Sequence, residues 1–171
     1  GAFYGPKIDF HLRDSLGRTW QCSTVQLDFA QPENFNIFYI DEEGKKKRPV
    51  MIHRVIYGSL ERFLGILIEN CGGAFPFWLA PVQAKIIPIS DKEIPYSIGI
   101  LEKLKGKGLR AELDDRSQSA SAKIRQAQEE KIPYMIIVGQ KEEKNQTINI
   151  RTREGKILGE KKLAAWLESI T

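Results

Sequence analysis

The chain has 171 residues, 42% of them hydrophobic and 28% charged, and its formal net charge at pH 7 is +4. This composition excludes a disordered polymer, and the length allows one ordinary domain or two small ones with an apolar core. The longest apolar run, residues 63–68, is far too short to cross a membrane, so no membrane partner is expected. The basic excess is compatible with a polyanionic partner without identifying one. Cys22 and Cys71 show no metal-binding or redox spacing, which favours two free thiols.

The first third of the chain predicts β-structure. Residues 7–13 alternate polar and apolar side chains, which is the period of a half-buried strand, and residues 19–29 alternate again. Polar side chains fall on both faces of this second strand, so we expect it to line a polar cavity. Two shorter strands are expected at residues 35–40 and 49–52, on either side of the charged residues 41–48. The basic run in that loop is interpreted as a solvated hairpin, with nucleic-acid contact as the alternative.

A helix is predicted to follow these strands. Gly58 and Ser59 mark its start, with Ser59 as the N-cap, and residues 71–73 mark its end. Its apolar side chains recur at helical spacing and form one face, which consists of Leu60, Phe63, Leu64, Leu67 and Ile68. An amphipathic helix is therefore expected here.

Residues 74–81 are rich in proline and aromatic side chains and indicate a connector, which divides the chain into domains 1–81 and 82–171. Strands are predicted beyond it at residues 83–90, 109–113, 134–138 and 147–151, the last two joined by a polar turn at 141–146. Helices are predicted at residues 94–108, 120–131 and 158–170. This alternation favours a small α/β domain with a largely parallel sheet and helices on its faces.

Few residues indicate chemistry when they are taken alone, and the sequence holds no nucleophilic triad, Gly-rich phosphate loop or Cys–His metal cluster. His11 and His53 are the only histidines, and a lone histidine is more often structural than a ligand. The most suggestive feature is Gly-Ser-Leu-Glu-Arg at residues 58–62, because a helix start favours anions through its free N–H groups and its dipole. Arg62 is suited to gripping a phosphate or stacking on a base. A surface arginine on an amphipathic helix is the alternative that periodicity alone favours.

Several longer motifs resemble one family. GAFYGPKIDF at residues 1–10 and WQCSTVQLDF at residues 20–29 are similar to segments of threonyl-tRNA synthetases. PVMIHR at residues 49–54, with GSLERF after it, resembles motif 3 of class II synthetases. Further resemblances to the family's domain join and to its anticodon domain are WLAPVQ at 78–83, KIR at 123–125, IPYM at 132–135 and RTREG at 151–155. The resemblance covers essentially the whole chain in one order and spacing.

The resemblance implies a fold, a reaction and partners. The expected fold is part of the antiparallel class II catalytic sheet with the motif 3 helix, followed by a small α/β anticodon-binding domain with a mixed five-stranded sheet and flanking helices. Enzymes of this family join threonine to ATP, which is used with magnesium, and then pass threonine to threonine tRNA. The implied partners are ATP, threonine and that tRNA, with a homodimeric parent protein in the cytoplasm.

The resemblance also implies roles for single residues. Those at the reaction centre are Lys7 and Arg62 as catalytic residues, Gln21, Gln26, Ser59 and Arg62 around ATP or the adenylate, and Tyr4 with Ser59 at the threonine pocket. His53 matches one protein ligand of the family's zinc, which recognises the amino and hydroxyl groups of threonine. Glu142 and Arg151 fall where the family contacts anticodon bases. Without the family, these two residues indicate a cross-strand pair on a solvated hairpin.

Parts of the family's pattern are missing, and the abrupt start of the sequence suggests a fragment of a longer protein. The family's zinc needs a Cys and a second His, and neither Cys22 nor Cys71 matches that Cys, so we expect weak zinc binding or none. Motifs 1 and 2 are absent, so the chain alone is expected not to form threonyl-adenylate. Residues 117–122 are small and neutral where the family has Asn, Lys, Gly and an aromatic. A stand-alone tRNA-binding or regulatory paralogue without ligase activity is the alternative.

Overall fold

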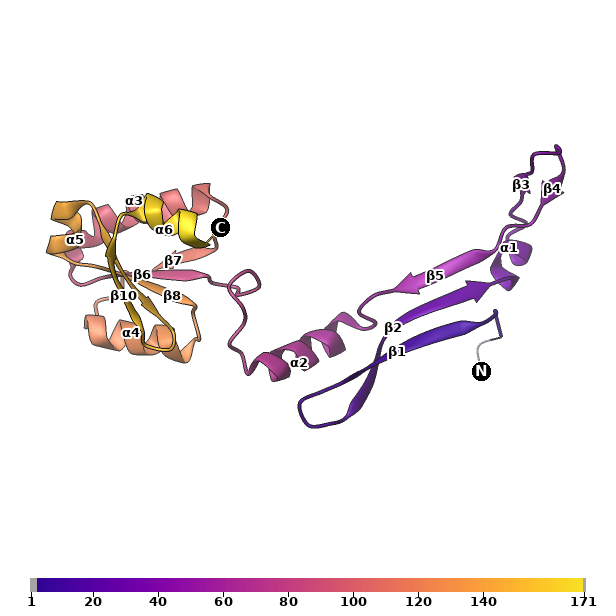
Figure 1. Cartoon of the computed structure of the whole chain (residues 1–171), viewed down its shortest axis with the longest axis horizontal. Coiled ribbons are helices and arrows are strands. Elements are labelled where there is room, and N and C mark those ends of the chain that lie inside the picture. Colours follow the sequence, from indigo (N-terminus) through magenta and orange to yellow (C-terminus); the bar gives the residue numbers. More distant parts are fainter. Residues whose placement is uncertain (1–2, 171) are drawn as a thin grey trace. The chain divides into compact units, whose positions relative to one another are not determined.

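The computed structural model describes residues 3–170 and divides the chain into two compact units, Gly1–Gly72 and Gly73–Thr171. The elements of the first unit are β1 (Lys7–Arg13), β2 (Thr19–Asp28), α1 (Ala30–Asn34), β3 (Tyr39–Ile40), β4 (Lys46–Lys47), β5 (Met51–Val55) and α2 (Leu60–Cys71) (Figure 1). Those of the second are β6 (Ala84–Pro88), the 3-10 turn η1 (Asp91–Glu93), α3 (Ile94–Gly106), β7 (Ala111–Leu113), α4 (Ala120–Glu129), β8 (Tyr134–Val138), α5 (Gln140–Asn145), β9 (Ile148–Thr152), β10 (Ile157–Lys161) and α6 (Leu163–Ile170). Within residues 3–170, no helix combines the length and the apolar character that a membrane crossing requires.

The division between the units falls before residues 74–81, the connector that the sequence assigned to the first domain. This connector is bonded within the second unit. Arg153 Nη1 donates to the carbonyl of Phe75 at 2.6 Å, and Arg110 Nε donates to the carbonyl of Ala80 at 3.0 Å. These bonds satisfy carbonyl groups that an irregular segment leaves without ladder partners. Structurally, the connector therefore belongs with the second unit.

The first unit is built on the antiparallel sheet β1-β2-β5, with β2 in the centre. Strand β1 has its predicted bounds, whereas the strand expected at residues 35–40 shrinks to β3 and is preceded by the unpredicted helix α1. Asp28 explains this helix. Its Oδ1 accepts the backbone N–H groups of Ala30 and Gln31, both at 2.9 Å, and so starts a helical turn where strand pairing ends.

A β-bulge in β2 decides which side chains share a face of this sheet. Phe10 pairs with Ser23 and the next residue, His11, pairs with Gln21, so Cys22 is an extra residue on β2. Residues directly opposite each other in an antiparallel pair share a face. The bulge therefore moves Gln21 onto the face that simple alternation assigns only to the even-numbered residues of β2.

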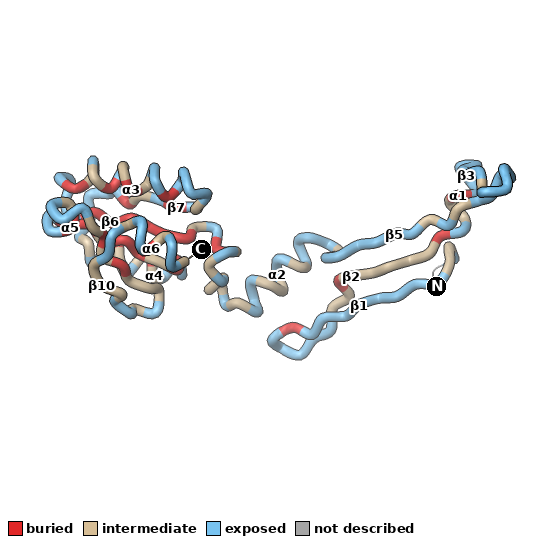
Figure 2. The backbone as a smooth tube through the Cα atoms, turned by 45° about the horizontal axis from the view of Figure 1, so that its top comes forward, coloured by how far each residue is buried: buried red, intermediate tan, exposed pale blue. Residues whose placement is uncertain are grey.

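Helix α2 begins and ends where the sequence predicts. Ser59 is the N-cap, with its Oγ accepting the N–H of Arg62 at 3.3 Å, and Gly72 closes the helix in the left-handed region at φ 55°. Every side chain of this helix is at least partly exposed, and Leu60, Leu64 and Ile68 are each half exposed or more (Figure 2). The predicted apolar face is thus only partly covered within the described part of this unit.

The second unit contains a five-stranded sheet in the order β10-β9-β8-β6-β7. Strand β6 pairs in parallel with β7 and β8, whereas β8 with β9 and β9 with β10 are antiparallel. The mixed five-stranded sheet is confirmed, and the largely parallel sheet that strand–helix alternation predicted is wrong for β9 and β10. A parallel return needs a crossover of about a dozen residues or more, and the segments after β8 and β9 are shorter than that.

Helices cover both faces of this second sheet, with α3 and α6 on one side and α4 on the other (Figure 1). Ile86 and Ile87 of β6 are both 0% exposed, although consecutive strand residues point to opposite faces. Ile86 belongs to a core cluster with Leu104 of α3 and Trp166 of α6, and Ile87 to a second cluster with Ala127 of α4. Figure 2 shows buried segments along β6 and within α3. The second unit thus has an apolar core on each side of its sheet.

Two predicted elements of the second unit are wrong. Residues 141–145 belong to helix α5 rather than to a turn, because Glu142 caps the start of the helix: its Oε2 accepts the N–H of Gly139 at 3.0 Å. Residues 158–170 divide into β10 and α6 rather than one helix. Gly159 has a φ of 82°, which an α-helix excludes.

Candidate functional site

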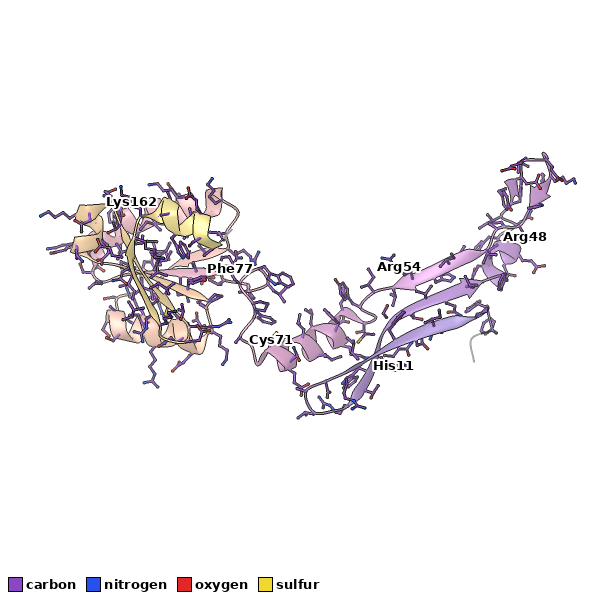
Figure 3. All side chains as sticks on the ribbon, in the orientation of Figure 1. His11, Arg48, Arg54, Cys71, Phe77 and Lys162 are labelled. Carbon is purple, nitrogen blue, oxygen red and sulfur yellow. The ribbon has the colours of Figure 1, made fainter. Side chains whose placement is uncertain are left out.

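One polar face of the first sheet gathers most of the predicted reaction-centre residues. Lys7 pairs with Gln26, and Gln26 pairs on its other side with His53, so these three residues cross the sheet in one row. The bulge adds Gln21 to the same face. Figure 3 labels Arg54, the residue after His53, on β5. Three strands therefore bring together residues that lie far apart in the sequence.

Asp9 organises this face, although no motif in the sequence singles it out. Its Oδ1 accepts hydrogen bonds from Gln21 Nε2 at 2.6 Å and Thr24 Oγ1 at 2.8 Å, and it forms an ion pair with Lys7 Nζ at 3.0 Å. The hydrogen bond from Lys7, joined by that from Thr24, lowers the pKa of Asp9. Lys7 and Gln21 are thereby held by one carboxylate. The only signal in the sequence is the position of Asp9 two residues after Lys7 on an alternating strand.

Gln26 lies between Lys7 and His53, and its side-chain amide has an unpaired hydrogen-bond donor within residues 3–170. Its Nε2 is buried and has no hydrogen-bond partner among residues 3–170. A buried amide nitrogen without a partner is costly, so such a group commonly awaits a ligand or a water molecule. This arrangement fits a role in holding a polar ligand above the sheet.

His53 faces a buried carboxylate. Its Nε2 lies 2.7 Å from Asp28 Oδ2, and the Asp28 side chain is 1% exposed while that of His53 is 48% exposed. Burial acts to raise the pKa of Asp28, but the N–H of Gln31 and the contacts with His53 and Ala30 outweigh it and lower that pKa. The His53 ring is therefore exposed, and the Asp28 carboxylate holds it through Nε2. Asp28 is a second residue that the sequence did not select.

Arg62 lies in the first turn of α2, beside the bulged strand. Its Nη1 donates to the carbonyl of Gln21 at 3.3 Å, and its guanidinium carbon is 5.8 Å from the centre of the Trp20 ring. The predicted N-cap Ser59 starts the same turn. The guanidinium thus stands at a helix N-terminus next to the polar face, where free N–H groups and the helix dipole favour an anion.

Trp20 is held by residues of the turn between β1 and β2. Its indole Nε1 donates to Asp14 Oδ2 at 2.7 Å, and Arg18 binds the same carboxylate and reaches Glu69 of α2 at 2.8 Å. Burial acts to raise the pKa of Asp14, and the hydrogen bonds from Trp20 and Arg18 overcome it and lower the pKa to about 2. This network ties the turn to the helix that carries Arg62.

Tyr4 lies toward the opposite end of β2. Its carbonyl accepts the N–H of Phe29 at 3.0 Å, which extends the pairing beyond Lys7 and Gln26, and its ring lies 4.1 Å from that of Phe3. Along β2, Tyr4 and His53 are therefore near the Asp28 end, whereas Arg62 is near Gln21. Lys7 lies in the same row as His53, opposite Gln26, and Asp9 lies between that row and Gln21.

His53 is the residue that the family resemblance links to zinc. An exposed imidazole backed by a carboxylate fits the chemistry of a zinc ligand. Within residues 3–170 there is no group of three or more His, Cys, Asp or Glu side chains that could hold an ion. His53 thus supplies one fitting ligand, and Cys22 and Cys71 are free thiols outside any such group in this range.

The two predicted anticodon-contacting residues occupy different elements of the second unit. Glu142 is 7% exposed and caps α5, and Arg151 lies in β9 opposite Met135. The interpretation as a cross-strand pair on a solvated hairpin is therefore wrong, because Glu142 is helical and largely buried. Arg151 Nε is buried without a hydrogen-bond partner in the described residues, and Arg151 Nη2 lies 3.5 Å from the point where a Cβ on Gly155 would stand. Arg151 thus has unused hydrogen-bonding capacity beside a glycine turn.

The small residues 117–122 start helix α4. Ser119 is the N-cap, and its Oγ accepts the N–H of Ala122 at 3.3 Å. Lys123 follows in the first turn and is 3% exposed, with Nζ donating to the carbonyl of Asp114 at 3.0 Å. The segment that departs from the family pattern therefore has a helix-capping function, and Lys123 has a structural one.

Comparison with known proteins agrees with both units. Residues 1–71 match the family described as tRNA synthetase class II core domain (G, H, P, S and T), and residues 83–170 match the Anticodon binding domain family. The chain is 55% identical to threonine–tRNA ligases of Natranaerobius thermophilus, over 99% of the chain, and of Clostridioides difficile, over 100%. It spans about a quarter of their length, 27% in each case. A solved structure of the RNA binding domain of threonyl-tRNA synthetase from Cryptosporidium parvum matches with a TM-score of 0.89 and 38% identity, over 99% of this chain and 43% of that one.

The fold and the two family matches are those of part of a class II aminoacyl-tRNA synthetase core, followed by an anticodon-binding domain. The two curated relatives named above match this chain over essentially its whole length, and both are threonine–tRNA ligases. The chain belongs to the threonyl-tRNA synthetase family.

Proposed function

We propose that the protein containing this chain is a threonine–tRNA ligase, which activates threonine with ATP and transfers it to threonine tRNA. The observation that carries this proposal is the assembly of Lys7, Gln21, Gln26 and His53 on one sheet face by register and bulge, with Arg62 beside it. Lys7, Gln21, Gln26 and Arg62 occupy positions where the family resemblance implies contact with the nucleotide, and His53 occupies that of a ligand of the zinc that recognises threonine. One face of an antiparallel sheet is often polar because it is solvated, but a buried amide nitrogen without a partner among residues 3–170 is costly, which favours a ligand on this face.

In the proposed reaction, Arg62 binds ATP by stacking and by phosphate contact. Its positive charge stabilises the charge that develops on the reacting phosphate. Lys7 reaches the adenylate region, and its ion pair with Asp9 holds it in place before the nucleotide binds. Gln21 and Gln26 contact the nucleotide, Ser59 shapes the helix start, and Tyr4 lines the threonine pocket. ATP enters with magnesium, which screens its phosphates.

His53 is proposed as one protein ligand of a zinc ion, with the other ligands supplied from outside these 171 residues. When bound, zinc would hold the amino and hydroxyl groups of threonine. The 171 residues alone are expected to bind it weakly or not at all, because no group of three or more His, Cys, Asp or Glu side chains in the described part of the chain could hold an ion. The same reasoning predicts that these residues alone do not form threonyl-adenylate.

The second unit is proposed to bind the anticodon of threonine tRNA. Arg151 suits bidentate or stacking contact with a base, and its Nε is buried and unpartnered within residues 3–170. Glu142 is proposed to accept from an exocyclic amine while its Oε2 keeps the cap on Gly139. The functional boundary between the domains is proposed at residues 81/82. The whole protein is proposed to be a cytoplasmic homodimer.

The test is threonine-dependent pyrophosphate exchange and tRNA charging by the full-length protein that carries this segment. Arg62→Ala should lower both rates by roughly 100-fold or more, because a preorganised charge at the transferring phosphate is lost. Lys45→Ala, which removes one exposed charge from the β3–β4 loop, is the matched control and should leave both rates nearly unchanged. Exchange that depends on a different amino acid, or that survives Arg62→Ala, would refute the proposal. Adenylate formation by the isolated 171 residues would refute their predicted inactivity.

A further inference from the structure

The contact between His53 and Asp28 joins the last residue of β2 to the middle of β5. His53 Nε2 lies 2.7 Å from Asp28 Oδ2, and the two side chains come from strands that pair in register with each other. A carboxylate in its ionised form only accepts hydrogen bonds, so the ring nitrogen that faces it must carry the proton. The geometry therefore constrains the imidazole as well as the carboxylate.

Asp28 cannot easily turn away from this contact. Its other oxygen, Oδ1, accepts the backbone N–H groups of Ala30 and Gln31 at 2.9 Å each, and its side chain is 1% exposed. Both carboxylate oxygens are thus committed, one to the start of α1 and the other to the histidine. Rotating the carboxylate would leave two backbone donors unpaired.

We propose that Asp28 is a positioning residue, which holds His53 in the neutral tautomer with the proton on Nε2 and leaves Nδ1 as the nitrogen that binds a ligand. The His53 side chain is 48% exposed, so a ligand can approach the ring. Backing carboxylates of this kind fix the tautomer and the ring orientation of metal-binding histidines and raise their basicity. This inference rests on the proposed zinc role only for the identity of the ligand, because the tautomer is a property of the chain itself.

Asp28→Asn is the informative variant. The asparagine Oδ1 can keep accepting from Ala30 and Gln31, so the start of α1 is retained. Its amide nitrogen replaces Oδ2 and can only donate, so it requires a lone pair on His53 Nε2. The variant should therefore move the proton of the neutral ring from Nε2 to Nδ1 without removing a buried contact.

Nitrogen-15 NMR of the full 171-residue chain at about pH 9 measures this directly, because neutral imidazole then dominates. The sequence contains only two histidines, so a His11→Gln variant assigns the His53 signals, and His11 in the original chain serves as the reference ring. Asp41→Asn is the matched control. Asp41 has the same arrangement in another loop, since its Oδ1 accepts from the N–H groups of Glu43 and Lys45 and its Oδ2 pairs with Lys47.

We expect His53 to carry its proton on Nε2 more completely than His11 does, and we expect Asp28→Asn, but not Asp41→Asn, to reverse the ratio of the two tautomers. A His53 ratio equal to that of His11, or one unchanged by Asp28→Asn while the amide signals of Ala30 and Gln31 stay in place, would overturn the inference. Zinc content of the full-length protein separates the two proposals. With the tautomer confirmed, a 10- to 100-fold lower zinc affinity of Asp28→Asn supports the metal as ligand, and a full-length protein without zinc refutes the zinc role alone.

Discussion

Gly58 lies directly against the backbone of Cys22: a Cβ on Gly58 would stand 2.5 Å from the Cys22 carbonyl oxygen. Gly58 precedes the N-cap of α2, and Cys22 is the extra residue of the bulge in β2. The start of the helix that carries Arg62 is therefore seated on the bulge that turns Gln21 toward Lys7. Within one unit, this contact joins the part of the proposed nucleotide site on α2, which holds Arg62, to the part on the sheet, which holds Gln21 and Lys7.

Substituting Gly58 tests that link. Gly58 has a φ of 70°, which costs an L-residue about 1–2 kcal/mol, and the clash with Cys22 adds about 1–3 kcal/mol. Gly58→Ala should lower the local stability of the first unit by roughly 2–5 kcal/mol, measured as faster hydrogen exchange of the β2 amides. Gly65→Ala is the control, because nothing lies within 4 Å of its Cβ position in the middle of α2, and alanine should stabilise the helix by up to about 1 kcal/mol. Equal effects of the two variants would contradict this account.

Lys123 provides a test of the second unit. Its Nζ is buried and donates to the backbone carbonyls of Asp114 and Pro88, at 3.0 and 3.5 Å. Lys123→Met keeps the aliphatic stem and removes the donor, so at least one carbonyl loses its bond, and the free energy of unfolding should fall by about 1–3 kcal/mol in urea. Arg125→Ala, two residues away with a side chain 82% exposed, should change it by less than about 0.5 kcal/mol. An unchanged free energy of unfolding in Lys123→Met would show that the buried amine does not stabilise the fold.

The lowered pKa of Glu160 predicts how the stability of the second unit changes in acid. Hydrogen bonds from Asn145, Lys141 and Thr147 lower its pKa from 4.5 to about 2. Because the pKa is lower in the folded state, the stabilisation is present above the unfolded pKa, near 4.5, and is lost as the pH falls toward 2. The urea midpoint of the second unit should therefore fall between about pH 5 and pH 2.5, and it should fall less steeply in Glu160→Gln. Glu129→Gln, on the outer face of α4, is the control, and identical slopes in the original chain and in Glu160→Gln would contradict the assignment.

Local sequence patterns predicted the elements whose signals are local. The bounds of β1 and β8, the N-cap at Ser59 and the helix end at Gly72 all depend on a short run of residues, and the structure confirms them. Helix α5 and strand β10 were not predicted. The bond from Gly139 to Glu142 that starts α5 belongs to no hydrophobic period, and β10 is held by bonds between distant residues, such as those from Asn145 and Thr147 to Glu160.

The candidate site could likewise be predicted only in part. Family resemblance selected Lys7, Gln21, Gln26 and Arg62, but simple alternation placed Gln21 on the wrong face, because a one-residue bulge has no clear sequence signal. Asp9 and Asp28 were missed because each acts by holding a neighbour rather than by matching a motif. Their importance became visible only once the register of three strands was known.

The measurement that tests the central claim most directly is binding of threonine tRNA to the 171-residue chain, compared with the same tRNA carrying an altered anticodon, across a salt series. We predict tighter binding to the unaltered tRNA at every salt concentration. Arg151→Ala should abolish this preference, whereas Lys47→Ala, which also removes one positive charge, should leave it intact. Equal and steeply salt-dependent binding to both tRNAs would show charge attraction alone and would contradict anticodon recognition by the second unit.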